Sequence, residues 1–584
     1  MTDSEVPVIP VETVPALPPL PPPRFFAVLA RRPFALLALL GLLLWLPGVL
    51  SLPALDRDES RFAQSSRQMV ESGDPIDIRL GRVPRYKKPV GIYWLQALST
   101  DVAGQIVYQG DDSHIWTYRL PSLLGAITAS WLTLWCALAF MESEAALLAG
   151  LLMLGSVLLA AEATIATTDA VLLACVLAVQ GVLLRVYRAA REPDAPAVPS
   201  RLIWLGWAAV GVGALVKFPV VPGVALVTVI ALAAWDRKWR WLAMLKPLRG
   251  MLLALVIASP WLIAISIQSH GAFLQESVGH DLAGKLAGGQ ESHGALPGYY
   301  LVLAAACFFP AILFVLPGIV LGIARRAEPG VRFLLAWAGG WWLVVEAVPT
   351  KLPHYVIDAY PALAILAGLF ITSSPPAVRW LAGWLTAARW IAGLQFFIGA
   401  ALLTTTLVLL PGYFGAGPVY WLWGIAGAAA LLSLAALILS IRRAHVWSAL
   451  LSLLAMLVFV PALTAAAGPR LTQLWVTQRL KPLVAAATQP GDPPPALAGY
   501  EEPSMLFAFG KDVVLADGAG AAEAGAKSGG LALVEDAEQG AFLARLAELQ
   551  ADAQVTGDLG GFNYSRGRKV HVTIYRVAQL RELH

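Results

Sequence analysis

Long apolar segments separated by short polar ones make up most of the chain, from residue 34 to residue 467. A helix needs about 20 apolar residues to cross a bilayer, because each residue advances about 1.5 Å along a hydrocarbon core about 30 Å thick. Windows of that length predict about thirteen transmembrane helices. The windows lie near residues 34–54, 117–140, 145–162, 168–187, 202–216, 218–235, 250–268, 299–322, 332–349, 354–372, 391–411, 419–441 and 446–467.

Composition supports this interpretation. Of the 584 residues, 58% are hydrophobic and 14% are charged, whereas soluble domains carry about 25% charged residues. The sequence therefore predicts a polytopic α-helical membrane protein. The three cysteines, Cys136, Cys175 and Cys307, lie within apolar segments and indicate neither a disulfide framework nor a metal site. We expect the Pro-rich residues 1–30 to form a cytoplasmic tail.

Basic residues between the predicted helices set the orientation. If the N-terminus is cytoplasmic, the clusters of Arg and Lys fall on one side of the membrane, and the positive-inside rule makes that side cytoplasmic. The connection at residues 142–144 is the weakest support for this orientation, since it has no basic residue. The clusters are Arg31-Arg32, Arg185/Arg188/Arg191, Arg237/Lys238/Arg240, Arg325-Arg326, Arg379/Arg389 and Arg442-Arg443.

The opposite side then receives nearly all the unusual polar residues. Ionisable groups that converge at one membrane boundary indicate a functional site. These residues lie in the loops 55–116 and 268–298, the turns 162–169, 217–219 and 350–354, and the segment from residue 468 onward.

The loop after the first helix is the most highly charged of these segments. Residues 56–88 contain fourteen Asp, Glu, Lys and Arg residues. At about 2.5–3.5 kcal/mol each in mid-bilayer, they would cost roughly 35 kcal/mol or more, so the loop lies outside the hydrocarbon. In so apolar a chain, this charged loop beside the membrane is the first place to expect catalytic residues.

The C-terminal residues 468–584 differ in kind from the transmembrane domain at 31–467. Alternating apolar residues at 512–515, 531–534 and 570–575 predict strands, and 541–551 predicts a helix. We expect a small α/β domain with Gly-rich connections at 517–530. Because its core is small, it should pack against the membrane domain.

Several short motifs follow one another in a recognisable order. Together they resemble the lipid A aminoarabinose transferases, within the protein-mannosyltransferase-like C-type glycosyltransferases. The motifs are Asp58-Glu59-Ser60-Arg61-Phe62-Ala63, Lys88-Pro89 with Tyr93-Trp94, Thr168-Asp169, Lys217 with Pro219, Lys351-Leu352-Pro353-His354-Tyr355, and the segment from Tyr500 to Gly510. Each motif alone is weak evidence, but the ordered set covers nearly the whole chain.

The resemblance implies a C-type glycosyltransferase fold in the bacterial inner membrane, with the active site and the α/β domain on the periplasmic face. It implies transfer of a sugar from an undecaprenyl-phosphate carrier to an acceptor there. The expected acceptor is lipid A or another glycolipid, and a protein is the alternative. We expect a monomer that contacts membrane lipids and binds no nucleic acid.

A polyprenyl phosphate donor needs cations for its phosphate and a carboxylate at the reacting centre. Lys88 is the expected phosphate ligand, because it is a point charge beside a Pro that restricts the backbone. We expect Arg85 and Lys87 to assist it, and Arg61 to bind the donor or the substrate. Asp58 is the expected catalytic carboxylate, acting as general base for a hydroxyl acceptor and orienting the groups around a phosphate acceptor.

Further site residues are expected at helix ends on the same side. Asp169 is the second catalytic carboxylate, and Lys217, Lys351 and Tyr355 are expected to bind the donor or the acceptor. Each assignment has a structural alternative. Asp58 and Asp169 also suit helix N-caps, and Lys88 and Lys217 could instead extend to phospholipid headgroups.

Departures from the family pattern bear on metal and sugar. The only cofactor considered is a divalent metal ion. The resemblance makes His280 a candidate ligand, but Lys87 stands where the family has an acidic residue, so His280 is a weak candidate. The Gly-rich loop 270–294 suits a gate over the cleft. Phe62 replaces a tyrosine, and Arg85 adds a cation, so the sugar is either aminoarabinose or an acidic sugar.

A transporter or flippase for the lipid-linked sugar is the rival interpretation. A transporter should show internal repeats and polar residues near the midplane of the membrane. The chain shows no repeat, and its charges cluster at one boundary. The sequence therefore favours the transferase.

Overall fold

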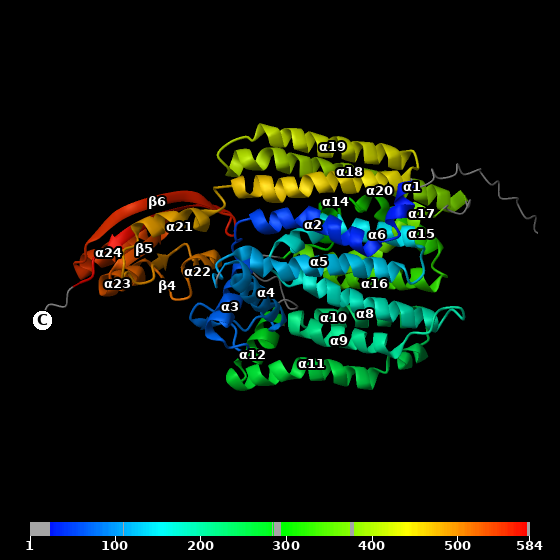
Figure 1. The fold of residues 1–584 in the computed structure, drawn as a ribbon, viewed down its shortest axis with the longest axis horizontal. Helices are drawn as coiled ribbons and strands as arrows, with labels where there is room; N and C mark the ends of the chain where they lie inside the picture. Colours follow the sequence, from blue (N-terminus) through cyan, green and yellow to red (C-terminus); the bar gives the residue numbers. More distant parts are fainter. Residues whose placement is uncertain (1–23, 109, 283, 285–293, 374–378, 581–584) are drawn as a thin grey trace, which may run out of the picture.

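A computed structural model describes residues 24–108, 110–282, 284, 294–373 and 379–580. A bundle of helices forms most of the molecule, and a small α/β domain is attached to one end of it (Figure 1). We call that end of the bundle the domain end. Most of the expected N-terminal tail, and residues 285–293 of the expected gate, lie outside the described residues.

The helices of the bundle follow the apolar windows closely. Their bounds are α1 Arg24–Leu29, α2 Pro33–Ser51, α5 Ile115–Ala137, α6 Ser143–Leu154, α7 Val157–Thr164, α8 Asp169–Ala189, α9 Ser200–Lys217, α10 Val220–Asp236, α11 Pro247–Gln268, α14 Tyr299–Cys307, α15 Ile312–Ala324, α16 Pro329–Ala347, η3 Pro353–Ala359, α17 Tyr360–Thr372, α18 Arg379–Phe414, α19 Tyr420–Ile441 and α20 His445–Pro461. Short helical turns at Arg240–Leu245, Ala462–Ala467 and Gly468–Arg470 accompany them.

All thirteen predicted windows are helical, and the predicted membrane fold class is confirmed. Among the described residues, nine helices are long and apolar enough to cross a membrane. A tenth span results if α6 and α7, which meet at 60°, are counted together. The other three windows contain the shorter α10, the interrupted pair α14 and α15, and α16.

The charged loop after α2 folds into two helices and a hairpin. Helix α3 (Asp58–Ser72) carries Asp58 and Glu59 in its first turn, where acidic side chains suit the positive end of the helix dipole. It ends at Gly73, which is left-handed with φ 68°. Strands β1 (Arg79–Leu80) and β2 (Val83–Pro84) pair before α4 (Gly91–Val107) begins.

A sheet of five strands in the order β4-β3-β5-β7-β6 forms the C-terminal domain. The first three strands are parallel, and β7 pairs antiparallel with both β5 and β6. This confirms the predicted small α/β domain. The strands are β3 Ala496–Ala498, β4 Val514–Ala516, β5 Gly530–Glu535, β6 Ala553–Asn563 and β7 Arg568–Val577, and the helices are α21 Val476–Ala487, α22 Pro503–Phe509, α23 Gly518–Ser528 and α24 Asp536–Leu549.

The Gly-rich stretch at 517–530 is a helix, α23, and the prediction of a loop there is wrong. The Asp517 carboxylate caps the helix by accepting a hydrogen bond from the Gly520 amide. The alanines between the glycines favour a helix. Gly518 allows close packing, since a Cβ there would lie 2.3 Å from the Glu538 carbonyl oxygen.

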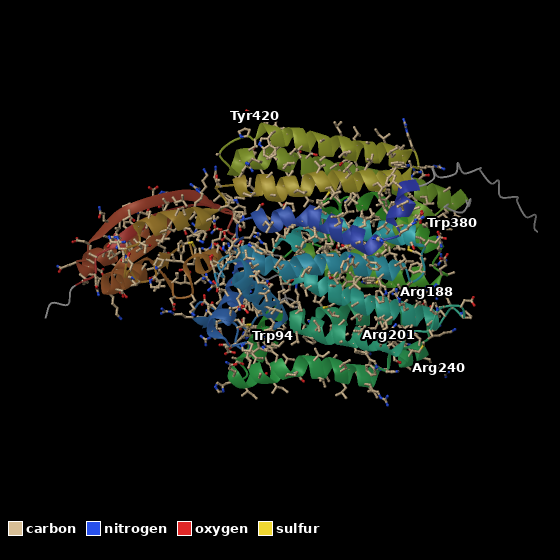
Figure 2. All side chains as sticks on the ribbon, viewed as in Figure 1. Trp94, Arg188, Arg201, Arg240, Trp380 and Tyr420 are labelled. Carbon is tan, nitrogen blue, oxygen red and sulfur yellow. The ribbon has the colours of Figure 1, made fainter. Side chains whose placement is uncertain are left out.

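Basic side chains mark the end of the bundle away from the domain. Arg188, Arg201 and Arg240 lie at that end, on the far side from the sheet (Figure 2). Arg191 and Arg332 there converge on Asp236, at 2.9 and 2.5 Å. We call this the basic end of the bundle.

Candidate active site

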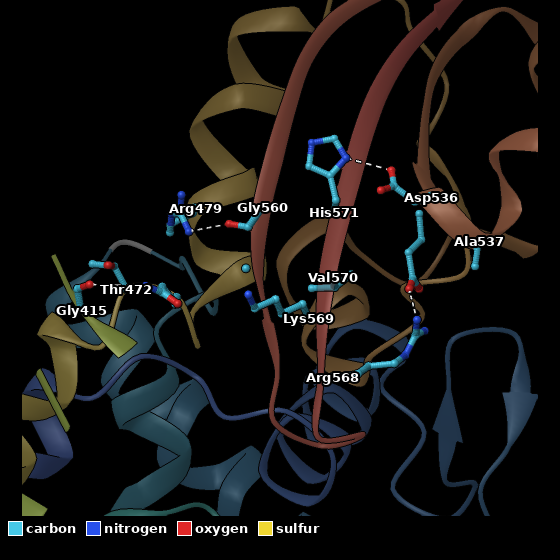
Figure 3. Close-up of a pocket in the computed structure, with 13 residues that line it drawn as sticks. Gly415, Thr472, Arg479, Asp536, Ala537, Gly560, Arg568, Lys569, Val570 and His571 are labelled. Carbon is cyan, nitrogen blue, oxygen red and sulfur yellow. Dashed lines mark hydrogen bonds and ion pairs between the residues drawn. The ribbon is translucent and has the colours of Figure 1, made fainter. Parts of the chain in front are cut away.

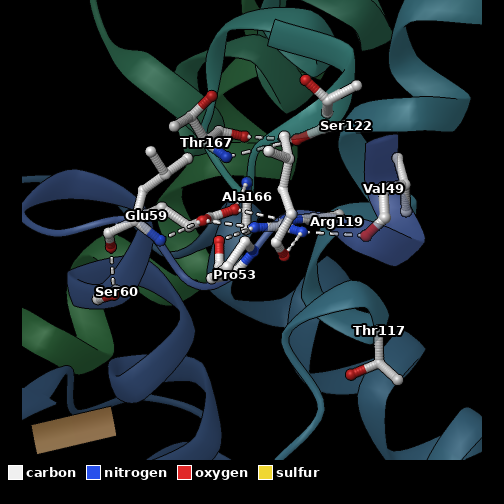
Figure 4. A network of polar contacts seen from close by, with 12 residues as sticks. Val49, Pro53, Glu59, Ser60, Thr117, Arg119, Ser122, Ala166 and Thr167 are labelled. Carbon is white, nitrogen blue, oxygen red and sulfur yellow. Dashed lines mark hydrogen bonds and ion pairs between the residues drawn. The ribbon is translucent and has the colours of Figure 1, made fainter. Parts of the chain in front are cut away.

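A buried ion pair holds the start of α3 in place. The Arg119 guanidinium on α5 donates two hydrogen bonds to the Glu59 carboxylate, at 2.7 and 2.8 Å, and neither side chain is exposed by more than 2% (Figure 4). Arg119 also donates to the carbonyl oxygens of Val49, Leu52 and Pro53. The pair therefore joins α5, the end of α2 and the start of α3.

Both oxygens of the Glu59 carboxylate are also fully hydrogen-bonded. Beside the two bonds from Arg119, its carboxylate accepts from the amides of Leu55 and Ala166, each at 2.8 Å. A buried charge pair stabilises a structure only when its remaining polar atoms are also satisfied. This network positions the adjacent Asp58 relative to the turn that precedes α8.

Asp58 faces solvent at the first position of α3. Its side chain is 63% exposed, and Arg61 lies one turn further on, with its Nη1 3.3 Å from the carboxylate. The N-cap residue is Arg57, which has φ 62°, and no side chain caps the helix. Asp58 is thus accessible to a substrate and does not act as the N-cap.

Asp169, Lys217 and His354 form a cluster at the domain end of the bundle; we call it the Asp169 cluster. Lys217 Nζ lies 2.7 Å from Asp169 Oδ1, and His354 Nε2 lies 4.0 Å from the same oxygen. The Thr168 hydroxyl donates to Asp169 Oδ2 at 3.0 Å. The N-cap residue of α8 is Thr168, so Asp169 is the first residue of the helix and not its cap, and Lys217 is 15% exposed rather than extended toward lipid.

Helix packing brings Lys88 close to this cluster. Helix α4 begins at Gly91, where a Cβ would lie 2.8 Å from the carbonyl oxygen of Leu215. Only glycine allows that approach to the last turn of α9, which ends at Lys217. Lys88 and Asp58 both lie near enough to act electrostatically on the His354 ring.

Arg85 lies on the aromatic side of this region. Its guanidinium stacks over the Phe62 ring at 5.4 Å, and Phe62 in turn contacts Tyr93 at 5.4 Å between ring centroids. The buried Arg85 Nε has no hydrogen-bond partner among the described residues. Arg85 thus lies between the Phe62 ring and Tyr93, and Phe62 contributes a ring face in place of a hydroxyl.

Of the two remaining predicted residues, Tyr355 belongs to the Asp169 cluster and Lys351 does not. Lys351 is buried, and its ammonium donates to the carbonyl oxygens of Val345, Glu346 and Val348 at 3.1, 2.6 and 2.7 Å. It thereby satisfies the end of α16 and is separate from the Asp169 cluster. Tyr355 joins that cluster, since Lys217 Nζ lies 5.6 Å from the centre of its ring.

Two buried acids near the cluster were missed by sequence reasoning. Glu162 is 5% exposed and accepts a hydrogen bond from the Thr167 hydroxyl at 2.8 Å. Asp358 is 3% exposed, and its Oδ1 has no hydrogen-bond partner among the described residues. Both interact electrostatically with Asp169 and Lys217. An acid inside an apolar window was the available signal in both cases.

The C-terminal domain contributes side chains at the edge of the site. The Tyr564 hydroxyl lies 2.6 Å from the Asp56 amide, and the Tyr500 hydroxyl donates to the Asp56 carboxylate at 3.3 Å. Burial, with the nearby Glu502, raises the pKa of the Asp56 carboxyl to about 6. Phe507 packs on Tyr118 of α5, at 5.6 Å between ring centroids. The domain therefore packs on the membrane helices, as its small core predicts.

The expected metal ligand His280 lies apart from these acids. Its Nδ1 is 3.1 Å from the Glu276 carboxylate, and its side chain is 67% exposed. The described residues contain no group of three or more His, Cys, Asp or Glu side chains placed to hold a metal ion. Among the described residues, His280 has only the Glu276 carboxylate beside it as a second donor, which is too few to hold a divalent ion.

A polar cavity lies between the sheet and the end of α18. It has a volume of about 810 Å³ and is bordered by Arg479, Lys569 and His571 (Figure 3). His571 lies 2.8 Å from Asp536 and 2.9 Å from Asp558. None of the predicted site residues borders this cavity, so it is separate from the Asp169 cluster.

Comparison with known sequences finds a family profile and several relatives that match parts of the chain. The sequence profile of the dolichyl-phosphate-mannose-protein mannosyltransferase family matches residues 87–263. The undecaprenyl phosphate-α-4-amino-4-deoxy-L-arabinose arabinosyl transferase of Pectobacterium carotovorum is 28% identical over 357 residues, 59% of each chain. That of Edwardsiella ictaluri is 27% identical over 334 residues. The chain thus matches less than two thirds of the length of these relatives.

Solved structures share the fold over a larger part of the chain. The crystal structure of ArnT from Cupriavidus metallidurans bound to undecaprenyl phosphate has a TM-score of 0.68 and 19% identity, covering 94% of this chain and 97% of that one. The oligosaccharyltransferase of Archaeoglobus fulgidus has a TM-score of 0.51 and 11% identity, over 90% of this chain and 69% of that one.

The chain shares the fold of these C-type glycosyltransferases over most of its length, and residues 87–263 match the mannosyltransferase family profile. The resemblance to the protein-mannosyltransferase-like superfamily is thereby confirmed. Within it, the chain resembles the undecaprenyl phosphate-aminoarabinose arabinosyl transferases.

Proposed function

We propose that this protein is a membrane glycosyltransferase that moves a sugar from a polyprenyl-phosphate donor to an acceptor at the domain end of the bundle. One observation carries the proposal: Asp58, Lys88 and the Asp169 cluster converge there on a fold shared with arabinosyl transferases. The flippase alternative finds less support, because these groups gather at one boundary and not at the midplane.

The donor phosphate binds to Lys88 and Lys217. A phosphate that leaves with both electrons of its bond to the sugar gains charge, and nearby ammonium groups stabilise that charge. Asp169, 2.7 Å from Lys217, holds the ammonium in position, and Tyr355 covers its other side. Arg85 and Arg61 border the sugar, with the Phe62 ring beside Arg85. Lys351 stabilises the end of α16.

Asp58 acts at the acceptor. An acceptor oxygen attacks the anomeric carbon, the bond from that carbon to the phosphate oxygen breaks, and polyprenyl phosphate leaves. If the acceptor is a hydroxyl, its proton passes to the Asp58 carboxylate. If the acceptor is an ionised phosphate, no proton is transferred, and Asp58 orients the attacking group. No step is assigned to a metal ion, since the described residues near His280 do not fit one.

The basic end of the bundle is the cytoplasmic end, by the positive-inside rule. The domain end then faces the periplasm of a bacterial inner membrane. Residues 1–30 are a cytoplasmic tail, 31–467 the transmembrane glycosyltransferase domain with periplasmic loops 55–116 and 268–298, and 468–584 the periplasmic α/β domain. The protein acts as a monomer.

The acceptor is lipid A or another glycolipid, and the sugar is aminoarabinose or an acidic sugar. The name of the relatives supports an aminopentose, whereas the Arg85 cation beside Phe62 supports an acidic sugar, since a guanidinium pairs well with a carboxylate. Measured transfer from both polyprenyl-phosphate sugars distinguishes them. Preferred use of the aminopentose would show that the inference from Arg85 is wrong.

Transfer by purified protein in liposomes, with a polyprenyl-phosphate sugar and an acceptor, tests the proposal. We expect Asp58→Asn and Lys88→Ala to lower kcat/KM by at least about 100-fold, the scale of losing one acid–base group or one group that stabilises developing charge. Lys87→Ala is the comparison variant at the neighbouring position, and because Lys87 is more exposed than Lys88, we expect a much smaller loss there. Wild-type turnover in both site variants, with normal membrane insertion, would refute this active site.

A further inference from the structure

Two cavities join along the outer edge of the bundle, between α18 and α19. One, of about 420 Å³, lies toward the basic end and is bordered by Arg389, Trp390 and Arg443. The other, of about 270 Å³, continues along the same helices toward the domain end. Phe397 and Leu437 border both, so they form one groove. Figure 1 shows α18 and α19 side by side at the edge of the bundle.

Two arginines at one end of this groove have no acidic partner among the residues that the structure describes. Arg389 is half-buried, and its Nη2 donates to the carbonyl oxygens of Ser440 and Ile441, at 2.8 and 3.1 Å. Among the described residues, the Nε and Nη1 atoms of Arg389 have no hydrogen-bond or ion-pair partner. The Arg443 side chain has none there either. The two guanidinium groups repel each other and both act on His445. An anion between them would relieve this repulsion.

The remainder of the groove is apolar and open to lipid. Leu394 and Phe397 are more than half exposed along α18, and Ala400, Ala401 and Ala430 border its narrower part. From Gly393 to Thr405 the helix advances roughly 18 Å. That is close to half of a hydrocarbon core about 30 Å thick, so one acyl chain of one leaflet fits this length.

We propose that this groove binds an anionic glycerophospholipid, with its phosphate against Arg389 and Arg443 and one acyl chain between α18 and α19. A zwitterionic lipid such as phosphatidylcholine carries an ammonium group beside its phosphate and brings no net negative charge to the two arginines, and a free phosphate would leave the apolar part uncovered. Basic pockets between membrane helices commonly bind anionic headgroups. The site lies at the basic end, whereas the Asp169 cluster lies at the domain end, so it is separate from the proposed donor site and independent of the proposed function.

Native mass spectrometry of the delipidated full-length protein tests this site directly. The protein is titrated with phosphatidylglycerol, with phosphatidylcholine of the same acyl chains, and with inorganic phosphate. We expect selective retention of phosphatidylglycerol. Arg389→Gln and Arg443→Gln should each weaken it about fivefold, and the double variant about 25-fold. Arg442→Gln is the matched control, because Arg442 is an exposed neighbour that does not border the groove.

A second variant tests where the acyl chain lies and leaves the arginines intact. Ala401→Trp fills the narrow part of the groove from a lipid-exposed position, so the protein should melt as wild type but retain less phosphatidylglycerol. Equal retention of phosphatidylcholine would overturn the role of the charges. Displacement by millimolar phosphate would reveal a free-anion site, and unchanged binding to Ala401→Trp would overturn the acyl-chain position.

Discussion

Neutralising two adjacent acids, in Asp58→Asn and Glu59→Gln, should separate catalysis from folding in this protein. The Asp58 side chain is 63% exposed and pairs only loosely with Arg61. The Glu59 side chain is 2% exposed and binds Arg119, which is fully buried. The first substitution removes the proposed general base, whereas the second removes the only carboxylate paired with Arg119 among the described residues.

The size of the Glu59 effect follows from the contacts of the pair. Arg119 keeps its three bonds to carbonyl oxygens in Glu59→Gln, but its charge loses its counterion. Removing one member of a buried ion pair costs about 3–5 kcal/mol. An exposed pair such as Asp58 with Arg61 is worth about 0–1 kcal/mol. Glu59→Gln should therefore unfold at a clearly lower temperature, and Asp58→Asn at the wild-type temperature.

The assay measures unfolding and sugar transfer on the same purified samples. Melting in detergent is followed at one scan rate, because membrane proteins of this size unfold irreversibly. Asp58→Asn should melt as wild type and lose transfer. Wild-type melting of Glu59→Gln would refute the role of the ion pair, and wild-type transfer by Asp58→Asn would refute the role of Asp58.

Three further predictions concern other parts of the site. Burial raises the pKa of the Asp56 carboxyl from 3.8 to about 6, so the folded state favours the protonated acid. The contribution of Asp56 to the free energy of unfolding is therefore complete below about pH 4 and is lost as the pH rises through 6. Asp56→Asn should therefore melt above wild type at pH 7.5, and the gap should shrink toward pH 4; a constant gap would contradict this. Lys217→Met should raise the KM for the donor at least about tenfold, and Lys217→Arg should partly restore it; an unchanged KM for Lys217→Met would remove Lys217 from the site. Dialysis against EDTA should leave transfer unchanged, and loss of activity that Mg²⁺ or Mn²⁺ restores would place a metal in the reaction.

Periodicity and hydropathy were sufficient to locate the helices, because membrane helices must satisfy their backbone hydrogen bonds internally. All thirteen windows are helical. The first third of the 36-residue α18, residues 379–390, lies outside the window at 391–411, since Arg379, Arg389 and several tryptophans interrupt its apolar run. The Gly-rich stretch that forms α23 was missed for another reason, because glycine lowers helix propensity while packing against α24 requires it.

The site was predictable only as far as residue type and helix ends allow. Helix order places Asp58, Lys88, Asp169 and Lys217 at one boundary, and the structure brings them near one another. The use of Lys351 at the end of α16 could not be predicted, since it depends on which way the chain turns after the helix. The pairing of Glu59 with Arg119 is likewise a contact across 60 residues that no local pattern indicates.

Transfer by the wild-type protein alone is the most direct test of the central claim. The protein is reconstituted in liposomes that contain a radiolabelled polyprenyl-phosphate sugar and lipid A. We predict that label moves to lipid A and that free polyprenyl phosphate appears in equal amount. Movement of the intact labelled donor across the bilayer, with no release of polyprenyl phosphate for any lipid or protein acceptor, would contradict the assignment and indicate a transporter.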